Sequence, residues 1–173
     1  MADTTSTSFI VVGVDGSDSS MDALRWAAGQ ARLTGADLHA ISAWDLPVGY
    51  GLAPGARAEE IAGQARKGLN AAIAQVFGDS PDMPLVARVE QGHPAPVLID
   101  ASCGADLLVV GNRGHGAFAG MLLGSVSQHC AQYAACPVLI VRHEREPVTA
   151  EVRSAERAEP AIGAPGVIAT GSL

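Results

Sequence analysis

The chain alternates between segments typical of strands and segments with helical spacing, and this alternation limits the folds open to it. Short, mostly apolar segments typical of strands span residues 9–15, 38–44, 85–90, 107–110 and 137–142. Helical spacing separates them, beginning with the set Leu24, Ala27, Ala28 and Ala31. Parallel strands need such crossover helices, so the pattern predicts an α/β fold with a mostly parallel sheet between two helical layers.

Apolar spacing and local end signals place four helices, expected over residues 24–31, 61–76, 97–101 and 125–135. Gly35 and Gly78 are suited to end the first two helices, because glycine readily takes the left-handed conformation found after a helix. Pro94 or Pro96 suits the start of the third. Residues 45–56 form a loop rich in Gly and Pro, long enough to be functional or mobile.

One folded domain with two flexible ends is expected. Residues 1–8 read as a flexible N-terminus and residues 9–143 as the domain, whose core the apolar fraction of 48% can fill. Residues 144–173 mix Glu and Arg with Ala, Pro and Gly and offer only isolated apolar side chains. Such a composition buries too little apolar surface to offset chain entropy, so this tail is expected to be disordered.

Composition excludes several classes of protein. The net charge of −7, from 18 acidic and 11 basic residues, argues against a nucleic-acid binder, which needs a concentrated basic face. No secretory signal is visible, and no apolar run approaches the roughly 18–20 residues that span a bilayer. The 3 cysteines form no Cys-x-x-Cys pair, so a disulfide framework is not expected. We therefore expect a cytoplasmic protein without a membrane or nucleic-acid partner.

A glycine-rich segment behind the strand at 107–110 is the strongest functional signal. Gly111 and Gly114 are followed, after nine further residues, by Gly124 and Ser125. Glycine has no Cβ to hold a phosphate away, and the N-terminus of the helix that follows presents N–H groups to an anion. The segment therefore predicts a phosphate site, with the hydroxyls of Ser125 and Ser127 alongside.

Asp15 follows the first strand as Gly111 follows the fourth. If the two strands are neighbours, Asp15 faces the glycine loop across one crevice at the carboxyl edge of the sheet, where ligands bind in such folds. Its carboxylate can accept hydrogen bonds from ribose hydroxyls or an adenine amine.

Each of these features has a structural alternative. The glycines can serve a tight turn alone, and Asp15 can cap the first helix with Ser17 and Asp18. His115 lies inside the motif and is a candidate phosphate contact. The 5 histidines have no metal-ligand spacing, so no metal site of the protein's own is expected. Cys130 and Cys136 are interpreted as small core side chains.

The chain resembles the ATP-binding branch of the universal stress protein family. The resemblance rests on the pattern Gly-x2-Gly-x9-Gly-Ser at 111–125, on Val-Asp-Gly-Ser at 14–17 and on Cys-Pro-Val-Leu-Ile-Val-Arg at 136–142, and it covers roughly residues 8–143. It implies a Rossmann-like, open five-stranded parallel sheet with strand order 3-2-1-4-5 between two helical layers. It also implies homodimers that pair their last strands. The four apolar residues Val138–Val141 in that strand support the expectation of a homodimer.

The resemblance also implies the ligand and its contacts. The ligand would be ATP, with Asp15 at the adenosine end and the backbone of Ala43 near the adenine. The phosphates would be lined by the residues of the glycine segment: Gly111, Arg113, Gly114, Gly124, Ser125 and Val126, with Ser127 beside them. The family pattern allows a divalent cation, Mg²⁺ or Mn²⁺, to accompany the phosphates.

Three functional hypotheses follow. The first is an ATP-binding regulatory protein of the stress response, and the second is a slow ATP-hydrolysing enzyme of the same fold. Lys67 is the only lysine and no Gly-x4-Gly-Lys-Ser/Thr motif exists, which excludes a standard P-loop enzyme. The third is an adenylating enzyme that releases pyrophosphate, whose Ser-Gly-Gly-x-Asp-Ser loop residues 15–20 match only in part.

Overall fold

The computed structural model describes residues 8–46, 54–78, 80–114 and 123–143, all of which belong to one compact unit, residues 1–143. The predicted flexible N-terminus, most of the loop at 45–56, His115 and the predicted tail at 144–173 lie outside the described residues. Among the described residues, no helix has both the length and the hydropathy that crossing a bilayer requires.

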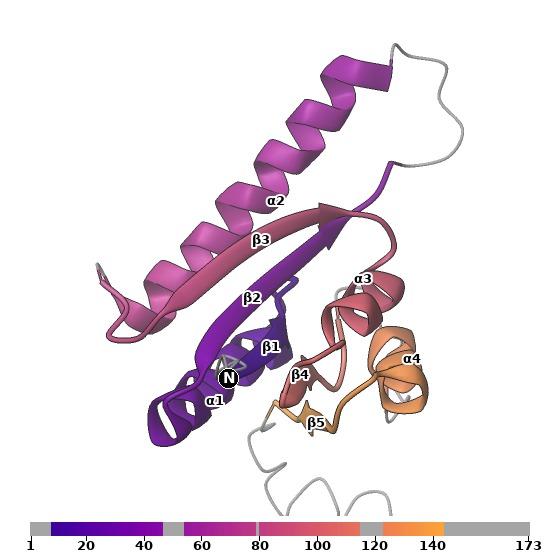
Figure 1. The fold of residues 1–173 in the computed structure, drawn as a ribbon. Helices are drawn as coiled ribbons and strands as arrows, with labels where there is room; N and C mark the ends of the chain where they lie inside the picture. Colours follow the sequence, from indigo (N-terminus) through magenta and orange to yellow (C-terminus); the bar gives the residue numbers. More distant parts are fainter. Residues whose placement is uncertain (1–7, 47–53, 79, 115–122, 144–173) are drawn as a thin grey trace, which may run out of the picture. The chain divides into compact units, whose positions relative to one another are not determined.

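A five-stranded parallel sheet with the order β3-β2-β1-β4-β5 forms the centre of the unit (Figure 1). The strands are β1 (Phe9–Gly13), β2 (Asp37–Trp44), β3 (Leu85–Gln91), β4 (Leu107–Gly111) and β5 (Val138–Val141). Four helices connect them: α1 (Asp18–Thr34), α2 (Pro54–Phe77), α3 (Pro94–Ala101) and α4 (Ser125–Tyr133). The predicted fold class and strand order are confirmed.

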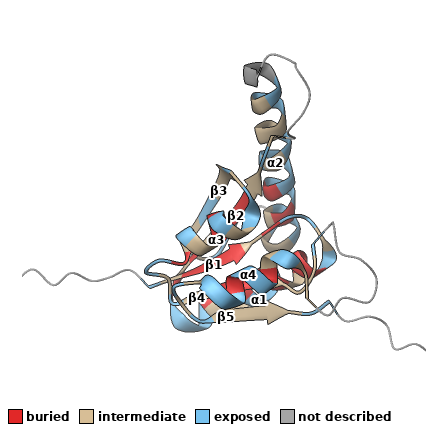
Figure 2. Cartoon of the chain, turned by 90° about the vertical axis from the view of Figure 1, so that its right-hand side faces the viewer, coloured by how far each residue is buried: buried red, intermediate tan, exposed pale blue. Residues whose placement is uncertain are grey.

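The helices form two layers with separate cores. One core packs α1 and α2 against alternate residues of the sheet such as Val12 and Val109. The other packs α3 and α4 against the opposite face, which Val11 and Leu108 occupy. Figure 2 shows buried residues along β1, the middle strand, which has paired neighbours on both sides. This burial on both faces explains the uninterrupted apolar runs in the sequence.

Helix α1 begins directly beyond the carboxyl end of β1 because of the residues at the connection. Gly16 bends the chain with a φ of 86°, and Ser17 is the N-cap, its side chain accepting a hydrogen bond from the Ser20 N–H. Strand β1 therefore ends at Gly13, two residues earlier than the sequence analysis placed it. At the other end, Gly35 takes the predicted left-handed conformation with a φ of 70°.

Most other bounds also differ from the sequence analysis by a few residues, and two of these differences have a physical cause. Helix α2 begins at Pro54, inside the segment predicted to be loop; proline suits a first helical position because it has no N–H to satisfy there. Helix α4 ends at Tyr133 and not at Ala135. The Ala135 N–H instead donates to the Ser102 hydroxyl at 2.8 Å, which turns the chain toward β5.

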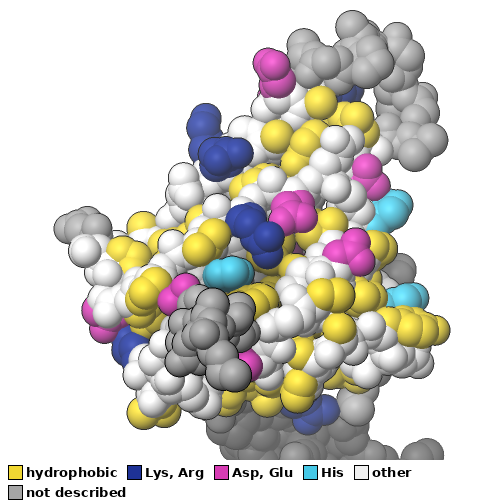
Figure 3. Space-filling model, viewed as in Figure 1, with side chains coloured by type: hydrophobic (Ala, Val, Ile, Leu, Met, Phe, Trp, Pro, Cys, Tyr) yellow, Lys and Arg dark blue, Asp and Glu magenta, His cyan; other side chains and the backbone are white. Residues whose placement is uncertain are grey.

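Charged side chains are scattered over the face of the unit drawn in Figure 3. Lys and Arg lie among Asp and Glu there. On that face the described residues form no basic patch of the kind that a phosphate backbone requires.

Candidate functional site

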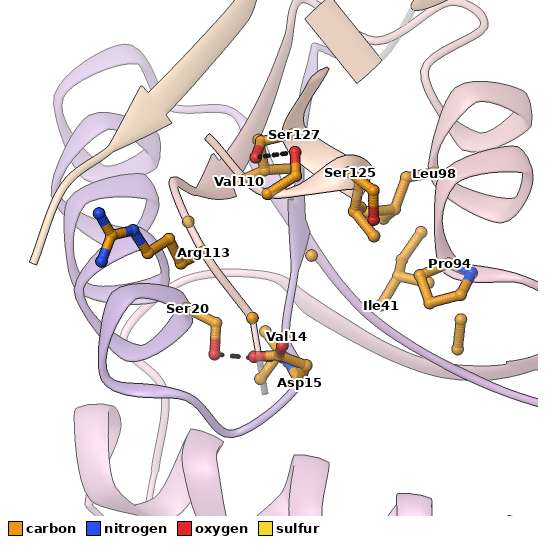
Figure 4. Close-up of a pocket in the computed structure, with 16 residues that line it drawn as sticks. Val14, Asp15, Ser20, Ile41, Pro94, Leu98, Val110, Arg113, Ser125 and Ser127 are labelled. Atoms are coloured by element: carbon orange, nitrogen blue, oxygen red, sulfur yellow. Dashed lines mark hydrogen bonds between the residues drawn. The ribbon is translucent and has the colours of Figure 1, made fainter. Parts of the chain in front are cut away.

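A cavity of about 510 Å³ lies at the carboxyl edge of the sheet. Strand β1 has β2 on one side and β4 on the other, so the chain leaves β1 and β4 in opposite directions along the sheet and opens a crevice between their ends. Sixteen of the described residues line the cavity (Figure 4). They include all the predicted site residues: Asp15, Ala43, Gly111, Arg113, Gly114, Gly124, Ser125, Val126 and Ser127.

One side of the cavity is apolar. Figure 4 shows Ile41, Pro94 and Leu98 together there, from β2 and from the start of α3. Ile41 and Leu98 are almost fully buried, and Val14 and Val110 add further apolar surface to the lining. Such walls suit a flat, weakly polar ring.

The polar side begins with Asp15, which is exposed at the bend between β1 and α1. Its Oδ1 accepts hydrogen bonds from the Ser17 N–H at 3.0 Å and from the Ser17 hydroxyl at 2.6 Å. Its Oδ2 occupies the place that a Cβ on Gly114 would take. The carboxylate therefore does face the glycine segment across one crevice, and it also orders the residue that caps α1.

Ser20, in the first turn of α1, stabilises the bend between β1 and α1. Its hydroxyl accepts from the N–H of Gly16 at 3.1 Å and donates to the carbonyl of Ser17 at 2.9 Å. The sequence analysis did not name Ser20 as a site residue.

The three motif glycines are required for different reasons. A Cβ on Gly111 would lie 2.6 Å from the Ser19 Oγ and 2.8 Å from the Ser19 carbonyl carbon, so this glycine lets β4 end against α1. A Cβ on Gly114 would displace the Asp15 carboxylate. A Cβ on Gly124 would meet its nearest neighbours at 3.5 Å, an ordinary contact. Packing within the protein therefore explains why residue 111 is a glycine, and it does not explain why residue 124 is one.

The N-terminus of α4 borders the same cavity without a side-chain cap. Its N-cap is Gly124, which makes no side-chain hydrogen bond. The N–H groups of the first turn, at Ser125, Val126 and Ser127, have no partner within a helix and point out of its end. Ser125 is exposed there. This is the geometry of an anion site, since the helix dipole adds positive potential at the same place.

Ser127 holds the two halves of the motif together. The side chain is buried, and its hydroxyl lies 3.1 Å from the Asn112 carbonyl and 3.0 Å from the Gly124 carbonyl, to which it donates. The Gly124 N–H donates to the same Asn112 carbonyl at 2.7 Å. In this state the hydroxyl is occupied by structural hydrogen bonds, a role that the sequence analysis did not foresee.

Arg113 borders the cavity mainly through its backbone. Its carbonyl accepts a hydrogen bond from the Ser19 hydroxyl, which ties the loop to α1. Figure 4 shows its guanidinium directed away from the side of the cavity where Pro94 and Leu98 lie. Its Nε is buried and has no hydrogen-bond partner among the described residues.

The described residues offer little to a metal ion on their own. They contain no group of three or more His, Cys, Asp or Glu side chains that could hold one. Asp15 is the only carboxylate among the described residues that line the cavity. A Mg²⁺ or Mn²⁺ ion at this place would therefore depend on oxygen atoms of a bound phosphate, which is how Mg²⁺ is commonly held beside nucleotides.

Several lining residues escaped the sequence analysis: Gly13, Val14, Ser20, Ile41, Pro94, Leu98 and Val110. Ile41 could have been predicted, because it lies two residues before Ala43 and on the same face of β2. Leu98 was not, because its position depends on how α3 packs over the sheet.

The universal stress protein family model matches residues 8–142. A universal stress protein of Mycolicibacterium smegmatis is 39% identical over 137 residues, which cover 77% of this chain and 45% of that protein. One of Mycobacterium tuberculosis is 36% identical over 144 residues, covering 77% of this chain and 44% of that protein. The chain thus spans about half the length of these curated relatives.

Solved structures agree with the family match. A universal stress protein crystallised in complex with cAMP is 33% identical, with a TM-score of 0.54, and covers 80% of this chain and 98% of that one. UspA from Lactobacillus plantarum, 23% identical with a TM-score of 0.66 over 79% of this chain and 98% of that one, shares the fold.

Proposed function

The chain belongs to the universal stress protein family, and on this premise we propose that it is a regulatory protein of the stress response that binds one ATP per chain. One cavity joins an apolar side, suited to a ring, to an uncapped helix N-terminus, suited to an anion. An adenine nucleotide carries both chemical groups, and this combination supports the proposal.

The proposed pose follows the two sides of the cavity. The adenine lies between Ile41 and Leu98, beside the backbone of Ala43. The Asp15 carboxylate accepts hydrogen bonds from the adenosine end, where its exposed position allows it to reach a ribose hydroxyl. This orientation directs the phosphates toward α4.

The phosphates then meet the N–H groups at the start of α4, with Gly114 and Gly124 leaving room for their approach. The Ser125 hydroxyl adds a further donor. A divalent cation supplies positive charge to the phosphate oxygens when it accompanies the nucleotide.

Of the two functions, the geometry favours ATP binding without efficient hydrolysis. Phosphoryl transfer requires positive charge and an oriented water placed around the γ-phosphate. Among the described residues that line the cavity, Arg113 is the only basic one, and its guanidinium is directed away from the apolar side. We therefore propose a binding protein whose nucleotide state alters its shape or partners, with slow ATP hydrolysis as the alternative.

A nucleotide of lower charge is the second candidate ligand. The structural relative at 33% identity was crystallised with cAMP, whose phosphate carries a single negative charge. A cavity with one basic and one acidic side chain compensates a single charge more readily than the several charges of ATP.

The experiment changes the charge at the start of α4. Ser125→Asp places a carboxylate where phosphates are proposed to bind, while a negative charge at a helix N-terminus stabilises the helix. We expect ATP affinity, measured by calorimetry, to fall at least about tenfold, which is about 1.4 kcal/mol, without a loss of thermal stability. Adenosine affinity should stay unchanged. Ser125→Asn is the neutral control and should bind ATP like the wild type.

The wild-type titrations decide between the ligands. ATP, ADP, AMP, cAMP and adenosine are compared with and without Mg²⁺. Tighter binding of AMP or cAMP than of ATP would favour the second candidate. If no adenine nucleotide binds, or if Ser125→Asp binds ATP normally, the proposed site is wrong.

A further inference from the structure

Two cysteines come together at the amino edge of the sheet, away from the cavity. Cys103 follows the end of α3, and Cys136 precedes β5. The two turns are joined directly: the Ser102 hydroxyl accepts the Ala135 N–H at 2.8 Å, and Ser102 is completely buried. Each cysteine is the next residue in the chain after one of these two bonded partners.

Cys103 is among the groups that act electrostatically on the Cys136 thiol. Burial raises the pKa of the Cys136 thiol, a hydrogen bond from the Leu108 backbone lowers it, and Asp106 and Cys103 raise it further. This agrees with the hydrogen bond that joins the two turns. The Cys136 Sγ is close to the Pro137 carbonyl, to which it donates at 3.4 Å.

The three cysteines differ in how far solvent reaches them. Cys103 is exposed, Cys136 is half-buried, and Cys130 has no exposed surface. Burial raises the pKa of Cys130 to about 11, so its reactive thiolate is scarce. The chain therefore contains an exposed thiol beside a partly covered one, with the inert Cys130 as an internal reference.

Metal binding does not account for this pair. Among the described residues, no group of three or more His, Cys, Asp or Glu side chains could hold an ion, although Asp106 lies near Cys136. Two thiols without a third ligand are suited to redox chemistry instead.

We propose that Cys103 and Cys136 are a redox modification site that forms a reversible disulfide within one chain when the protein meets a peroxide. The Cys103 thiolate attacks a peroxide oxygen; the O–O bond breaks, and the leaving hydroxide takes the thiol proton as water. Cys136 then attacks the sulfur of the resulting sulfenic acid. The S–O bond breaks, the S–S bond forms, and a second water leaves, so two thiols and one peroxide yield one disulfide and two waters.

The cross-link joins the two helices that carry part of the cavity wall. Helices α3 and α4 lie side by side in Figure 1 and Figure 2 and pack in the same core. Pro94 and Leu98 of α3 and Ser125 of α4 line the cavity. A bond near the C-terminal ends of both helices would hold them together from the edge opposite the ligand.

The test treats the full, folded chain with hydrogen peroxide, blocks the remaining thiols with iodoacetamide under denaturing conditions, and digests without reductant. Cleavage after Arg113 separates Cys103 from the other cysteines, and cleavage after Tyr133 separates Cys130 from Cys136. Mass spectrometry should find the Cys103 and Cys136 peptides joined, with the mass of two hydrogens lost, and alkylated Cys130. Dithiothreitol should restore both free thiols.

Matched variants complete the test. Cys103→Ser and Cys136→Ser should each abolish the linked peptide, while circular dichroism confirms that both remain folded. The proposal is overturned if the wild type forms only links between two chains, if Cys130 replaces either partner, if the link appears only in urea, or if Cys103 is oxidised without joining Cys136.

Discussion

At the residue scale, the lack of a Cβ is required by packing at one motif glycine, Gly111, and is proposed to serve ligand access at another, Gly124. Gly111 faces the first turn of α1, where a Cβ would press on both backbone and side chain of Ser19. A Cβ on Gly124 would make only ordinary contacts, the nearest at 3.5 Å. Substitution of Gly111 therefore tests packing within the protein, and substitution of Gly124 tests the proposed ligand access.

Gly111→Ala should destabilise the fold. The added Cβ would lie under 3 Å from backbone atoms of Ser19, and such overpacking costs about 1–3 kcal/mol. Gly29→Ala is the matched control, because Gly29 is within α1 and a Cβ there meets nothing within 4 Å. That variant should gain about 0.5–1 kcal/mol from helix propensity. Urea unfolding of both measures the difference; equal stabilities would contradict the packing role of Gly111.

Asp15→Ala should reduce both stability and ligand binding. It removes the acceptor of two hydrogen bonds from Ser17 and the proposed contact to the adenosine end. We expect affinities for ATP, ADP and adenosine to fall alike, by about 1.5–3 kcal/mol, the range for a hydrogen bond to a charged group.

Ser17→Ala separates the two roles of Asp15. It deletes the cap of α1 and leaves the carboxylate in place, so it should melt lower and still bind the nucleotide. Thermal melts and titrations on the same preparations compare the variants. If Asp15→Ala also binds normally once folded, Asp15 is a capping residue only.

The sequence predicted which residues line the cavity better than it predicted the directions and hydrogen bonds of their side chains. Every predicted site residue lines the cavity, because each is in a motif or on a strand whose end is fixed by topology. The direction of the Arg113 guanidinium and the structural hydrogen bonds of Ser127 depend on contacts with α1 and with the loop carbonyls. Such contacts join residues far apart in the chain, so no local sequence pattern predicts them.

At the scale of elements, strands were easier to predict than helix ends. Buried parallel strands are uninterrupted apolar runs, which the sequence displays directly. The end of α4 depends on the Ser102 hydroxyl, 33 residues away from its partner Ala135, and the start of α2 on a proline inside a loop-like composition. The strand order itself came from the family resemblance and not from the pattern.

His39, on β2, is expected to make the stability of the fold depend on pH. Its ring stacks on Phe9 with centroids 4.6 Å apart. Burial lowers the pKa of His39 below its ordinary value of 6.5, the Arg88 charge lowers it further, and Asp37 partly offsets both. The unfolded chain then binds the proton more readily than the folded one, so this group reduces stability as the pH falls through 6.5.

His39→Gln should remove that part of the acid sensitivity. Urea unfolding at about pH 7.5 and about pH 5 should show a smaller loss for the variant than for the wild type. The remaining histidines and the carboxylates are common to both proteins and cancel in the comparison. Identical losses would mean that His39 titrates normally.

At the scale of the whole molecule, β5 is one edge of the sheet and the proposed site of a homodimer. The carbonyls of Pro137 and Val141 accept bonds from β4, at 2.9 Å from the Leu108 nitrogen and 2.7 Å from the Asn112 nitrogen. Successive residues of a strand point their backbone groups to opposite sides, so the N–H groups of Val138 and Ile140 face outward. Two such edges related by a two-fold axis can pair antiparallel.

Ile140→Pro should therefore yield a monomer that stays folded. It deletes an outward donor and leaves the ladder between β4 and β5 intact, and proline is tolerated on edge strands. Leu139→Pro is the contrasting variant, because its N–H faces β4 and its loss should destabilise the fold. Light scattering at micromolar concentration should show a dimer for the wild type. A monomeric wild type, or a dimeric Ile140→Pro, would refute this arrangement.

The shared carbonyl of Asn112 has a consequence for the length of the motif. It receives both the Gly124 N–H and the Ser127 hydroxyl, which fixes the start of α4 beside the end of β4 whatever segment connects them. Each doubling of the length of a flexible connection between two fixed ends costs only about 0.6 kcal/mol of entropy. Folding therefore tolerates many lengths between Gly114 and Gly124, and an insertion there should leave the melting temperature nearly unchanged. The nine-residue spacing between Gly114 and Gly124 would then be a requirement of the proposed nucleotide site and not of the fold.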